Sequence, residues 1–456
     1  MKILLINPGI VESNFTFKPD FIVNLEPLGL EYLAGMLLAG HEIEILDGLG
    51  TGLTNEQIIT TLGNFKPDII GISLSYSKIT KSAKEIAKII KKHSPDLPVV
   101  FGGNAATFTA QDLIKEPYVD IIVLGEGEIT FKELIKKWEE GSMKYEVGSG
   151  KCESQIPNLK SQISSIPGLC YKTSDGEIKL TPKRPLIEHL DSLALPAHSI
   201  LKNKIYYKRT VSTTRGCPYN CIYCSASAFF KKYRERSISN VMKEIESLFN
   251  ADYSYIIKGI SFIDDIFTFN QNRVKELCWE LSNLRDKLNL KENFSWECST
   301  RMENITEDLL KTMKDAGCER ILFGIESGSP KILKRLNRKY TPDDVITVTK
   351  LCKNLGISPV TSFILGLPYE TKEDLDLTFS LISRKKGPTG LSILTAFPGT
   401  EIFNNPQKYD LTIFAHLPED AHHERAWIEN NYLTREEITK AYYDARYFAR
   451  SLKKNK

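Results

Sequence analysis

The sequence predicts an α/β protein with two parallel sheets: a doubly wound, flavodoxin-like domain at the N-terminus and a partial, TIM-like (β/α)6 barrel after it. Two patterns support this fold class. Apolar strands and amphipathic helical stretches alternate along residues 1–140, which is typical of a parallel sheet with helices on both faces. Six further strand–helix units follow within residues 206–400, and six units form an incomplete relative of the eight-fold barrel.

The first domain has five predicted strands, at Lys2–Asn7, Glu42–Leu46, Ile69–Leu74, Val99–Phe101 and Ile121–Leu124. Predicted helices lie between them, at Pro27–Ala39, Thr54–Phe65 and Ile79–His93. Because ligands of such sheets bind beyond the carboxyl ends of the strands, we expect a ligand crevice where small and polar residues follow these strands. Those residues are Asn7, Ser73, Ser75, Gly102, Gly103, Asn104, Gly125, Glu126 and Gly127.

The second domain has six predicted strands, at Val211–Arg215, Gly259–Ile263, Phe294–Ser299, Arg320–Gly324, Pro359–Leu365 and Leu391–Ala396. In barrels, reactive groups at the carboxyl ends of the strands face one cavity. The groups at or just beyond these ends are Asp264, Asp265, Arg301, Glu326 and Gly366. The two aspartates could serve acid–base chemistry or contact substrate, or they could cap the next turn. A rim ion pair is the structural alternative for Arg301 and Glu326.

Two segments lie outside these domains. Residues 141–205 are rich in Gly and Ser and then alternate around Asp175-Gly176, which predicts a connector that contains a hairpin. Residues 401–456 form a C-terminal helical segment whose last helix begins with the capping box Thr434-Arg-Glu-Glu437. The run Asp420-Ala-His-His423 is more typical of a polar loop or a lid than of a metal site.

Composition bounds the function of this 456-residue chain, whose net charge is +3 from 60 basic and 57 acidic residues. That balance does not favour a nucleic-acid partner. Nine cysteines without a paired spacing indicate a reducing compartment, so we expect a cytoplasmic location. The sequence contains no apolar run of about 18 residues, so we expect no membrane span.

The most specific motif is the run Thr214-Arg-Gly-Cys-Pro-Tyr-Asn-Cys-Ile-Tyr-Cys-Ser225. It places Cys217, Cys221 and Cys224 in one loop with the spacing C-x3-C-x2-C. Thiolates select iron–sulfur clusters, zinc or copper(I), and a 4Fe–4S cluster normally takes four cysteines. Three cysteines would leave one iron open to a cosubstrate. A zinc site would need a fourth ligand, and the nearest histidines in sequence are the distant His198 and His416.

This run resembles the signature of the radical S-adenosylmethionine superfamily. The resemblance implies a 4Fe–4S cluster on the three cysteines, with S-adenosylmethionine chelated by the open iron and cleaved to a 5′-deoxyadenosyl radical. It also implies an electron donor such as flavodoxin or ferredoxin. By the same resemblance, Tyr223 would lie against the adenine, Gly366 would belong to the strand that approaches it, and Arg301 and Glu326 would contact the amino-acid and ribose parts.

The first domain resembles the cobalamin-binding domain that precedes many such barrels. The resemblance is carried by Glu26-Pro-Leu-Gly-Leu-Glu-Tyr-Leu-Ala34, by Gly102-Gly103 and by Gly125-Glu-Gly-Glu128. It implies that the glycine-rich strand ends contact the corrin ring and its nucleotide tail. Many relatives read Gly-Gly-Pro-His where this chain has Gly102-Gly103-Asn104-Ala105, and the loop after the first strand has no histidine. We therefore expect cobalamin without a protein histidine on cobalt.

The whole chain is similar to the subgroup that includes anaerobic magnesium-protoporphyrin ester cyclases and radical methylases. The resemblance implies a methyltransferase that acts on an unactivated carbon of a small-molecule, lipid or tetrapyrrole substrate. One alternative is the same radical start followed by cyclisation, rearrangement or carbon–carbon bond formation without methyl transfer. Another is a non-enzymatic iron–sulfur or zinc scaffold.

Overall fold

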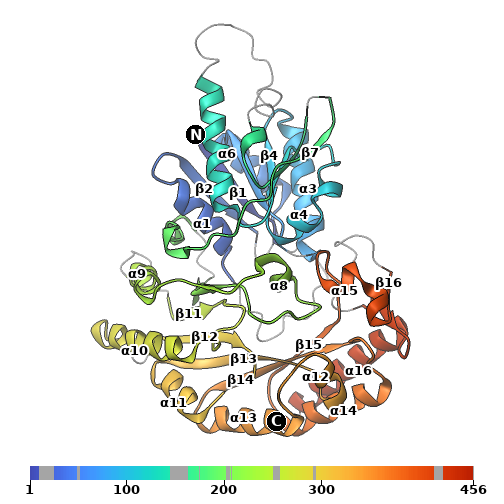
Figure 1. Ribbon diagram of the computed structural model, residues 1–456. Helices are drawn as coiled ribbons and strands as arrows, with labels where there is room; N and C mark the ends of the chain where they lie inside the picture. The colour runs from blue at the N-terminus through green and yellow to red at the C-terminus, as the bar shows by residue number, and fades with distance from the viewer. Residues whose placement is uncertain are drawn as a thin grey trace. The chain divides into compact units, whose positions relative to one another are not determined.

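The structure is a computed structural model that describes residues 1–9, 25–48, 52–75, 77–143, 163–173, 175–201, 206, 208–249, 257–290, 294–303, 305–414 and 425–454. The chain divides into two compact units, Met1–Ile205 and Tyr206–Lys456. Each unit is built around one main sheet (Figure 1). The pair His422 and His423 and the neighbouring His416 lie outside the described residues. No helix in the described ranges has the length and hydrophobicity needed to span a membrane.

The first unit contains a seven-stranded sheet in the order β2-β1-β3-β4-β5-β6-β7. The strands are β1 (Lys2–Asn7), β2 (Glu42–Asp47), β3 (Ile69–Ser73), β4 (Val99–Gly102), β5 (Ile121–Val123), β6 (Leu169–Lys172) and β7 (Ile178–Leu180). β1 to β5 pair in parallel, and the order 2-1-3-4-5 is that of flavodoxin-like sheets. The doubly wound prediction is confirmed.

The predicted hairpin differs from expectation in its place. The sequence predicts this hairpin within a connector. In the structure, β6 pairs antiparallel with β5, and β7 pairs antiparallel with β6, so both strands extend the sheet of the first unit. The physical reason is burial: Leu169, Cys170 and Tyr171 are almost fully buried against that sheet. An unpaired β5 would otherwise leave a sheet edge exposed.

Helices flank this sheet in two packed pairs, α1 with α6 and α2 with α3. The helices are α1 (Leu28–Leu37), α2 (Asn55–Phe65), α3 (Ser77–His93), α4 (Asn104–Phe108), α5 (Ala110–Leu113) and α6 (Gly127–Met143). Thr54 caps α2 in a capping box with Gln57. Residues Ile3 to Ile6 of β1 are fully buried, as expected for a central parallel strand covered on both faces.

The second unit contains a six-stranded parallel sheet in the order β8-β11-β12-β13-β14-β15. The strands are β8 (Lys208–Val211), β11 (Gly259–Phe262), β12 (Ser295–Thr300), β13 (Cys318–Glu326), β14 (Ser358–Leu365) and β15 (Thr389–Ile393). Strands that are neighbours in sequence are therefore neighbours in space, as in a partial barrel. The (β/α)6 prediction is confirmed.

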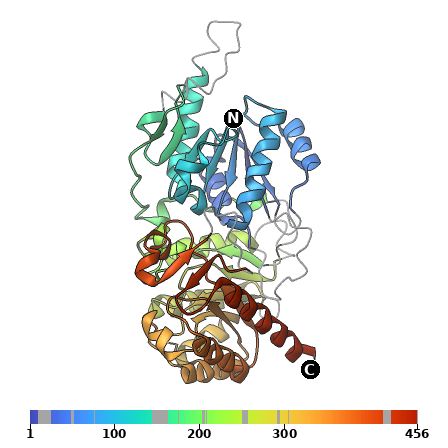
Figure 2. The same cartoon turned by 90° about the vertical axis from the view of Figure 1, so that its right-hand side faces the viewer.

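Helices α10, α11, α13 and α14 cover the outer side of this sheet (Figure 1). The helices of this unit are α8 (Ser225–Phe230), α9 (Ile238–Phe249), α10 (Gln271–Lys287), α11 (Glu307–Asp315), α12 (Pro330–Arg335), α13 (Pro342–Asn354), α14 (Lys372–Lys385), α15 (Glu401–Asn404) and α16 (Arg435–Lys454). Buried residues of α9 to α14 and of the strands form one large core that includes Trp296 and Phe323. Figure 2 shows α16 alongside this sheet, and α16 packs against β14 and β15. The predicted capping box of Thr434 and Glu437 is present.

The first predicted strand of the barrel divides in two. β8 ends at Val211, and β9 (Thr214–Arg215) pairs instead with β10 (Arg234–Glu235) in a small antiparallel sheet. The break occurs because Asp264 accepts the N–H groups of Thr213 and Thr214. A second antiparallel pair, β16 (Leu411–Ile413) with β17 (Ile428–Asn430), precedes α16.

Candidate active site

The cysteine loop leaves β9 and ends at α8. Cys224 is the N-cap residue of α8, and its N–H donates to the carbonyl of Cys221 at 3.0 Å. Gly216 opens the loop with φ of +83°, and a Cβ there would lie 2.3 Å from the carbonyl oxygen of Lys232. Only glycine therefore allows this tight approach. The loop presents three half-buried free thiols on one short segment.

The three thiols offer soft ligands of the kind that iron–sulfur clusters and zinc select. Burial raises the pKa of Cys217 to about 11, so metal binding there would have to release the proton.

The two aspartates after β11 hold the start of this loop. The carboxylate of Asp264 accepts the N–H groups of Thr213 at 2.7 Å and Thr214 at 3.1 Å, and also the Thr213 hydroxyl. Asp265 accepts the N–H of Gly216 at 3.1 Å. Burial raises the pKa of both carboxyls, that of Asp265 to about 6 with a further contribution from Asp264. Their known partners are thus backbone and hydroxyl groups of the cysteine segment.

Arg338 joins the cysteine loop to the end of β13. Its Nη2 donates to Glu326 Oε1 at 2.6 Å and to the hydroxyl of Tyr223 at 3.0 Å. Both charged side chains are almost fully buried, at 3% and 10% exposure. Glu326 has φ of +71° at a register shift in the strand pairing, and such strain is typical of functional positions. The structure therefore brings together two of the predicted residues, Tyr223 and Glu326.

Arg338 is a site residue that the sequence reasoning missed. Its Nε and Nη1 are buried and have no hydrogen-bond partner in the described part of the chain. Buried donors of a guanidinium normally find an acceptor, so two unused donors beside the cysteine loop fit an anionic ligand such as a carboxylate. The sequence does show a basic residue soon after α12, the helix that follows β13. It does not show that this residue is buried.

Arg301 lies against the same loop in a different way. Its guanidinium donates to both oxygens of Glu303, at 3.1 and 2.5 Å, and to the carbonyl of Asn337 at 3.2 Å. The guanidinium carbon lies 3.7 Å from the ring centre of Tyr219, which stands between the first two cysteines. Burial raises the pKa of Cys221, and the positive charges of Arg338 and Arg301 partly offset this increase. Arg301 thus pairs with Glu303 and not with Glu326, the partner in the structural alternative that the sequence left open.

Gly366 forms the turn at the end of β14, with φ of +82°. Its N–H donates to the carboxyl of Glu370 at 2.6 Å, and the N–H of Leu367 donates to the same oxygen. A Cβ at Gly366 would lie 3.0 Å from the side chain of Ile438 in α16. Burial raises the pKa of Glu370 to about 8. The turn shape is therefore fixed by a buried carboxyl and by close packing.

Most of the predicted residues at the strand ends of the first unit are small or neutral. The Asn7 amide donates to Asp47 at 2.8 Å, and the hydroxyls of Ser73 and Ser75 lie 3.0 Å apart. A Cβ at Gly125 would meet no atom within 4 Å, whereas a Cβ at Gly103 would lie 2.9 Å from the Leu74 carbonyl oxygen. These ends leave room for a bulky ligand at Gly125.

The four remaining predicted residues of this unit have different environments. Asn104 begins α4, and its side-chain oxygen is buried without a hydrogen-bond partner in the described residues. Glu126 instead accepts the N–H of Ile187 at 2.9 Å, so its carboxylate holds the segment after the hairpin. Gly102 ends β4, and Gly127 begins α6. An unpartnered amide oxygen at a strand end fits a ligand with amide donors, as the corrin side chains have.

Comparison with known proteins decides the family. The model of the radical SAM superfamily matches residues 211–382, and that of the B12 binding domain matches residues 23–135. An uncharacterised methyltransferase of Pyrococcus horikoshii is 34% identical over 411 residues, which cover 88% of this chain and 82% of that protein. The chain belongs to the radical SAM superfamily.

Other relatives agree with this assignment. The anaerobic magnesium-protoporphyrin IX monomethyl ester cyclase of Rubrivivax gelatinosus is 28% identical over 88% of this chain and 69% of its own length. The fold matches that of the radical S-adenosylmethionine methyltransferase TsrM from Kitasatospora setae, solved with cobalamin and a [4Fe-4S] cluster. That match has a TM-score of 0.69, 21% identity, and coverage of 90% of this chain and 76% of the other.

This radical SAM enzyme therefore uses a 4Fe–4S cluster, S-adenosylmethionine and cobalamin. It is a cobalamin-dependent enzyme of the group that includes methyltransferases. The cofactor part of the sequence prediction is confirmed. The residues that contact each cofactor remain predictions and are considered below.

Proposed function

We propose that this radical SAM enzyme transfers a methyl group to an unactivated carbon of a small-molecule substrate, with lipids and tetrapyrroles as the candidate classes. The match to a methyltransferase over most of both chains supports methyl transfer. When bound, the cluster with S-adenosylmethionine supplies one-electron chemistry and cobalamin supplies the methyl group. The protein residues bind and orient these groups.

The observation that carries the proposal is the buried Arg338 with its two unused donors. In our account Arg338 binds the carboxylate of S-adenosylmethionine beside the cysteine loop, because a guanidinium is a strong partner for a carboxylate. Glu326, held by the same guanidinium, accepts hydrogen bonds from the amino or ribose groups. Tyr223 offers its ring to the adenine, and Gly366 shapes the turn that approaches it.

Cys217, Cys221 and Cys224 hold the cluster in this account, and the two aspartates position their loop. Asp264 and Asp265 contact the backbone from Thr213 to Gly216, so a positioning role has more support than the acid–base role proposed from sequence. Arg301, stacked on Tyr219, holds the other side of the loop. Contact of Arg301 with the cosubstrate stays a prediction.

Cobalamin would bind at the strand ends of the first unit. Asn104 offers a buried acceptor, Gly125 has open space where a Cβ would lie, and Ser73 and Ser75 offer hydroxyls. The four histidines of this unit have other neighbours or places: His41 lies 3.4 Å from Glu139 and His198 lies 2.9 Å from Glu31, while His93 ends α3 and His189 is exposed. We propose that cobalt receives no histidine from this unit.

The experiment that tests the function uses anaerobically purified protein with flavodoxin or ferredoxin as the proposed electron donor. The enzyme is incubated with S-adenosylmethionine carrying a deuterated methyl group and with fractionated lipid or tetrapyrrole extracts. We expect 5′-deoxyadenosine together with a product that carries the label. Formation of 5′-deoxyadenosine with an unlabelled product would favour cyclisation, the second candidate, which the cyclase relative supports.

The compartment follows from the thiol chemistry. Eight cysteines in the described residues are free, and a cluster on exposed thiolates needs reducing conditions. We propose a cytoplasmic location. Fractionation of the source cells with an antibody to the chain tests this; recovery in an oxidising compartment would contradict it.

A further inference from the structure

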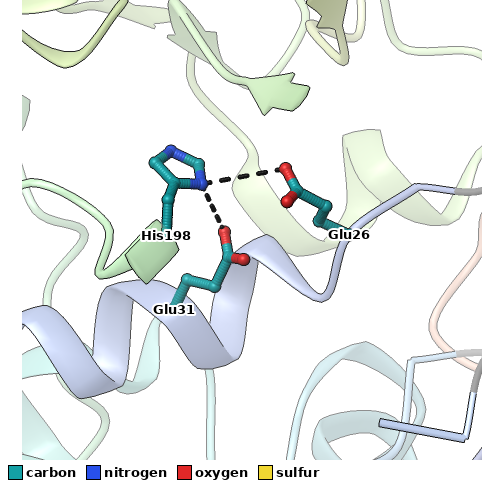
Figure 3. A group of neighbouring side chains, drawn as sticks. All are labelled: Glu26, Glu31 and His198. Carbon is teal, nitrogen blue, oxygen red and sulfur yellow. Dashed lines mark ion pairs between the residues drawn. The ribbon is translucent and has the colours of Figure 1, made fainter. Parts of the chain in front are cut away.

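A second constellation of metal-ligating side chains lies in the first unit, remote in sequence from the cysteine loop. Glu26 directly precedes α1, Glu31 lies in the first turn of α1, and His198 begins the short 3-10 helix His198–Ile200. Figure 3 shows the three side chains pointing toward one another. His198 Nδ1 lies 2.9 Å from Glu31 Oε2 and 3.7 Å from Glu26 Oε2. All three ligand atoms lie within 4.8 Å of one another.

The group is buried. The side chains of both glutamates are 0% exposed and that of His198 is 3% exposed. Neither carboxylate oxygen of Glu31 has a hydrogen-bond partner in the described part of the chain. Burying a carboxylate without a hydrogen-bond donor or a compensating charge costs several kcal/mol. The side chain of Glu31 therefore points to an additional ligand.

Chemistry and geometry indicate which ligand. Two carboxylates and one imidazole within 4.8 Å of one another form a donor set that suits a divalent cation. Octahedral or tetrahedral bonds of about 2.1 Å place ligand atoms about 3.0 to 3.4 Å apart. The distances from His198 Nδ1 to the two glutamates, 2.9 and 3.7 Å, lie just below and just above this range. Carboxylates with an imidazole suit manganese, iron(II) or zinc.

We propose that Glu26, Glu31 and His198 bind a divalent cation of this class. The cation fastens the segment before β8 to α1, because His198 and Glu31 come from sequence-distant elements. The segment already lies close to the helix: the N–H of Ala197 donates to the carbonyl of Glu31 at 2.9 Å. A Cβ at Gly35 would lie 2.2 Å from the carbonyl oxygen of Leu195. The site is independent of the proposed methyl transfer.

The test uses Mn²⁺ as the probe, because carboxylate and imidazole bind it while soft thiolates prefer other metals. The full chain, with its cluster oxidised and cobalamin bound, is titrated with MnCl₂ while the electron paramagnetic resonance signal of free Mn²⁺ is recorded. We expect one bound Mn²⁺ per chain, with affinity lowered about tenfold or more in Glu31→Gln and in His198→Asn. His189→Asn, which alters an exposed histidine of the same segment, should leave the affinity unchanged.

A second measurement keeps the proposal falsifiable if a variant folds poorly. A ligand that binds only the folded chain stabilises it by RT ln(1 + [L]/Kd), so the unfolding temperature rises as the ligand concentration exceeds the Kd. MnCl₂ should therefore raise the unfolding temperature of the wild-type chain, and a chelator should reverse the rise. The proposal fails if the wild-type chain binds no Mn²⁺ at millimolar concentration, or if Glu31→Gln binds it equally well. If folding stability changed with pH but not with added metal, the cluster would bind a proton and not a cation, and the proposal would be wrong.

Discussion

The carboxyl edges of the two sheets differ in chemistry. At the edge of the barrel, buried charges meet around the cysteines: Arg338 pairs with Glu326, and Arg301 pairs with Glu303. At the edge of the doubly wound sheet, the predicted residues are mainly glycines, serines and amides. The difference suits two ligands of different character. A charged amino acid and a cluster need fixed opposite charges, whereas a broad macrocycle needs backbone that can approach closely.

The largest effect should come from Cys221→Ala. Removing one of three thiolates should abolish cluster assembly, so iron content and 5′-deoxyadenosine formation should fall to background. Cobalamin bound by the first unit should remain, because its proposed ligands belong to the other sheet. Iron analysis, the cobalamin absorbance spectrum and product chromatography measure these three quantities.

Cys278→Ala is the matched control, since Cys278 is a buried thiol of α10 outside the loop. Its iron content should equal that of the wild-type chain. If Cys221→Ala kept its iron, the proposed division of labour between the two edges would be wrong.

The next largest effect should come from Arg338→Gln. Truncating one partner of a buried, hydrogen-bonded charge pair costs about 2 to 5 kcal/mol, so the affinity for S-adenosylmethionine should fall by about 30-fold or more. Equilibrium binding of S-adenosylmethionine to the cluster-loaded chain measures it. Arg335→Gln, which changes an exposed arginine of α12, should bind like the wild-type chain. Equal affinities in the two variants would remove Arg338 from the site.

Asn104→Ala should act on the other edge with a smaller effect. The Asn104 oxygen has no hydrogen-bond partner in the described residues, so its loss should cost the chain little stability. It should weaken cobalamin binding by about 1 kcal/mol, the typical worth of one hydrogen bond. Cobalamin titration followed by absorbance measures the change, with exposed Asn64→Ala as the control. A large loss of stability with unchanged cobalamin affinity would show that Asn104 serves the fold.

A separate prediction concerns folding stability, Glu370 and pH. Burial raises its pKa to about 8 from 4.5, so the folded chain holds a proton that the unfolded chain releases between these values. Folding stability should therefore fall with rising pH in this window, by up to about 1.4 kcal/mol per pH unit. Glu370→Gln should remove that contribution while its amide oxygen still accepts the N–H of Gly366. Denaturant unfolding at several pH values checks this, and identical slopes for both chains would contradict it.

The sequence predicted what depends on local pattern. The C-x3-C-x2-C spacing identified the cysteine loop, and the alternation of apolar runs identified both parallel sheets. It also predicted the capping box that begins at Thr434, because a capping box is formed by residues close in sequence. The (β/α)6 topology followed because neighbouring βα units in sequence are neighbours in space.

Features that depend on contacts between distant segments were missed. The hairpin joins the first sheet because β6 pairs with β5 across a long insertion. Arg338 is exceptional only through its burial and its bonds to Tyr223 and Glu326. Similarly, Arg301 was predicted from its place after β12, but its partners Glu303 and Tyr219 were not.

The most direct test of the account is electron paramagnetic resonance of the reduced, cluster-loaded chain with and without S-adenosylmethionine. If the three cysteines leave one iron open and Arg338 helps to seat the cosubstrate, the reduced 4Fe–4S signal should change shape when S-adenosylmethionine is added. In Arg338→Gln the same change should require a much higher concentration. A wild-type signal that saturating S-adenosylmethionine leaves unaltered would contradict the account.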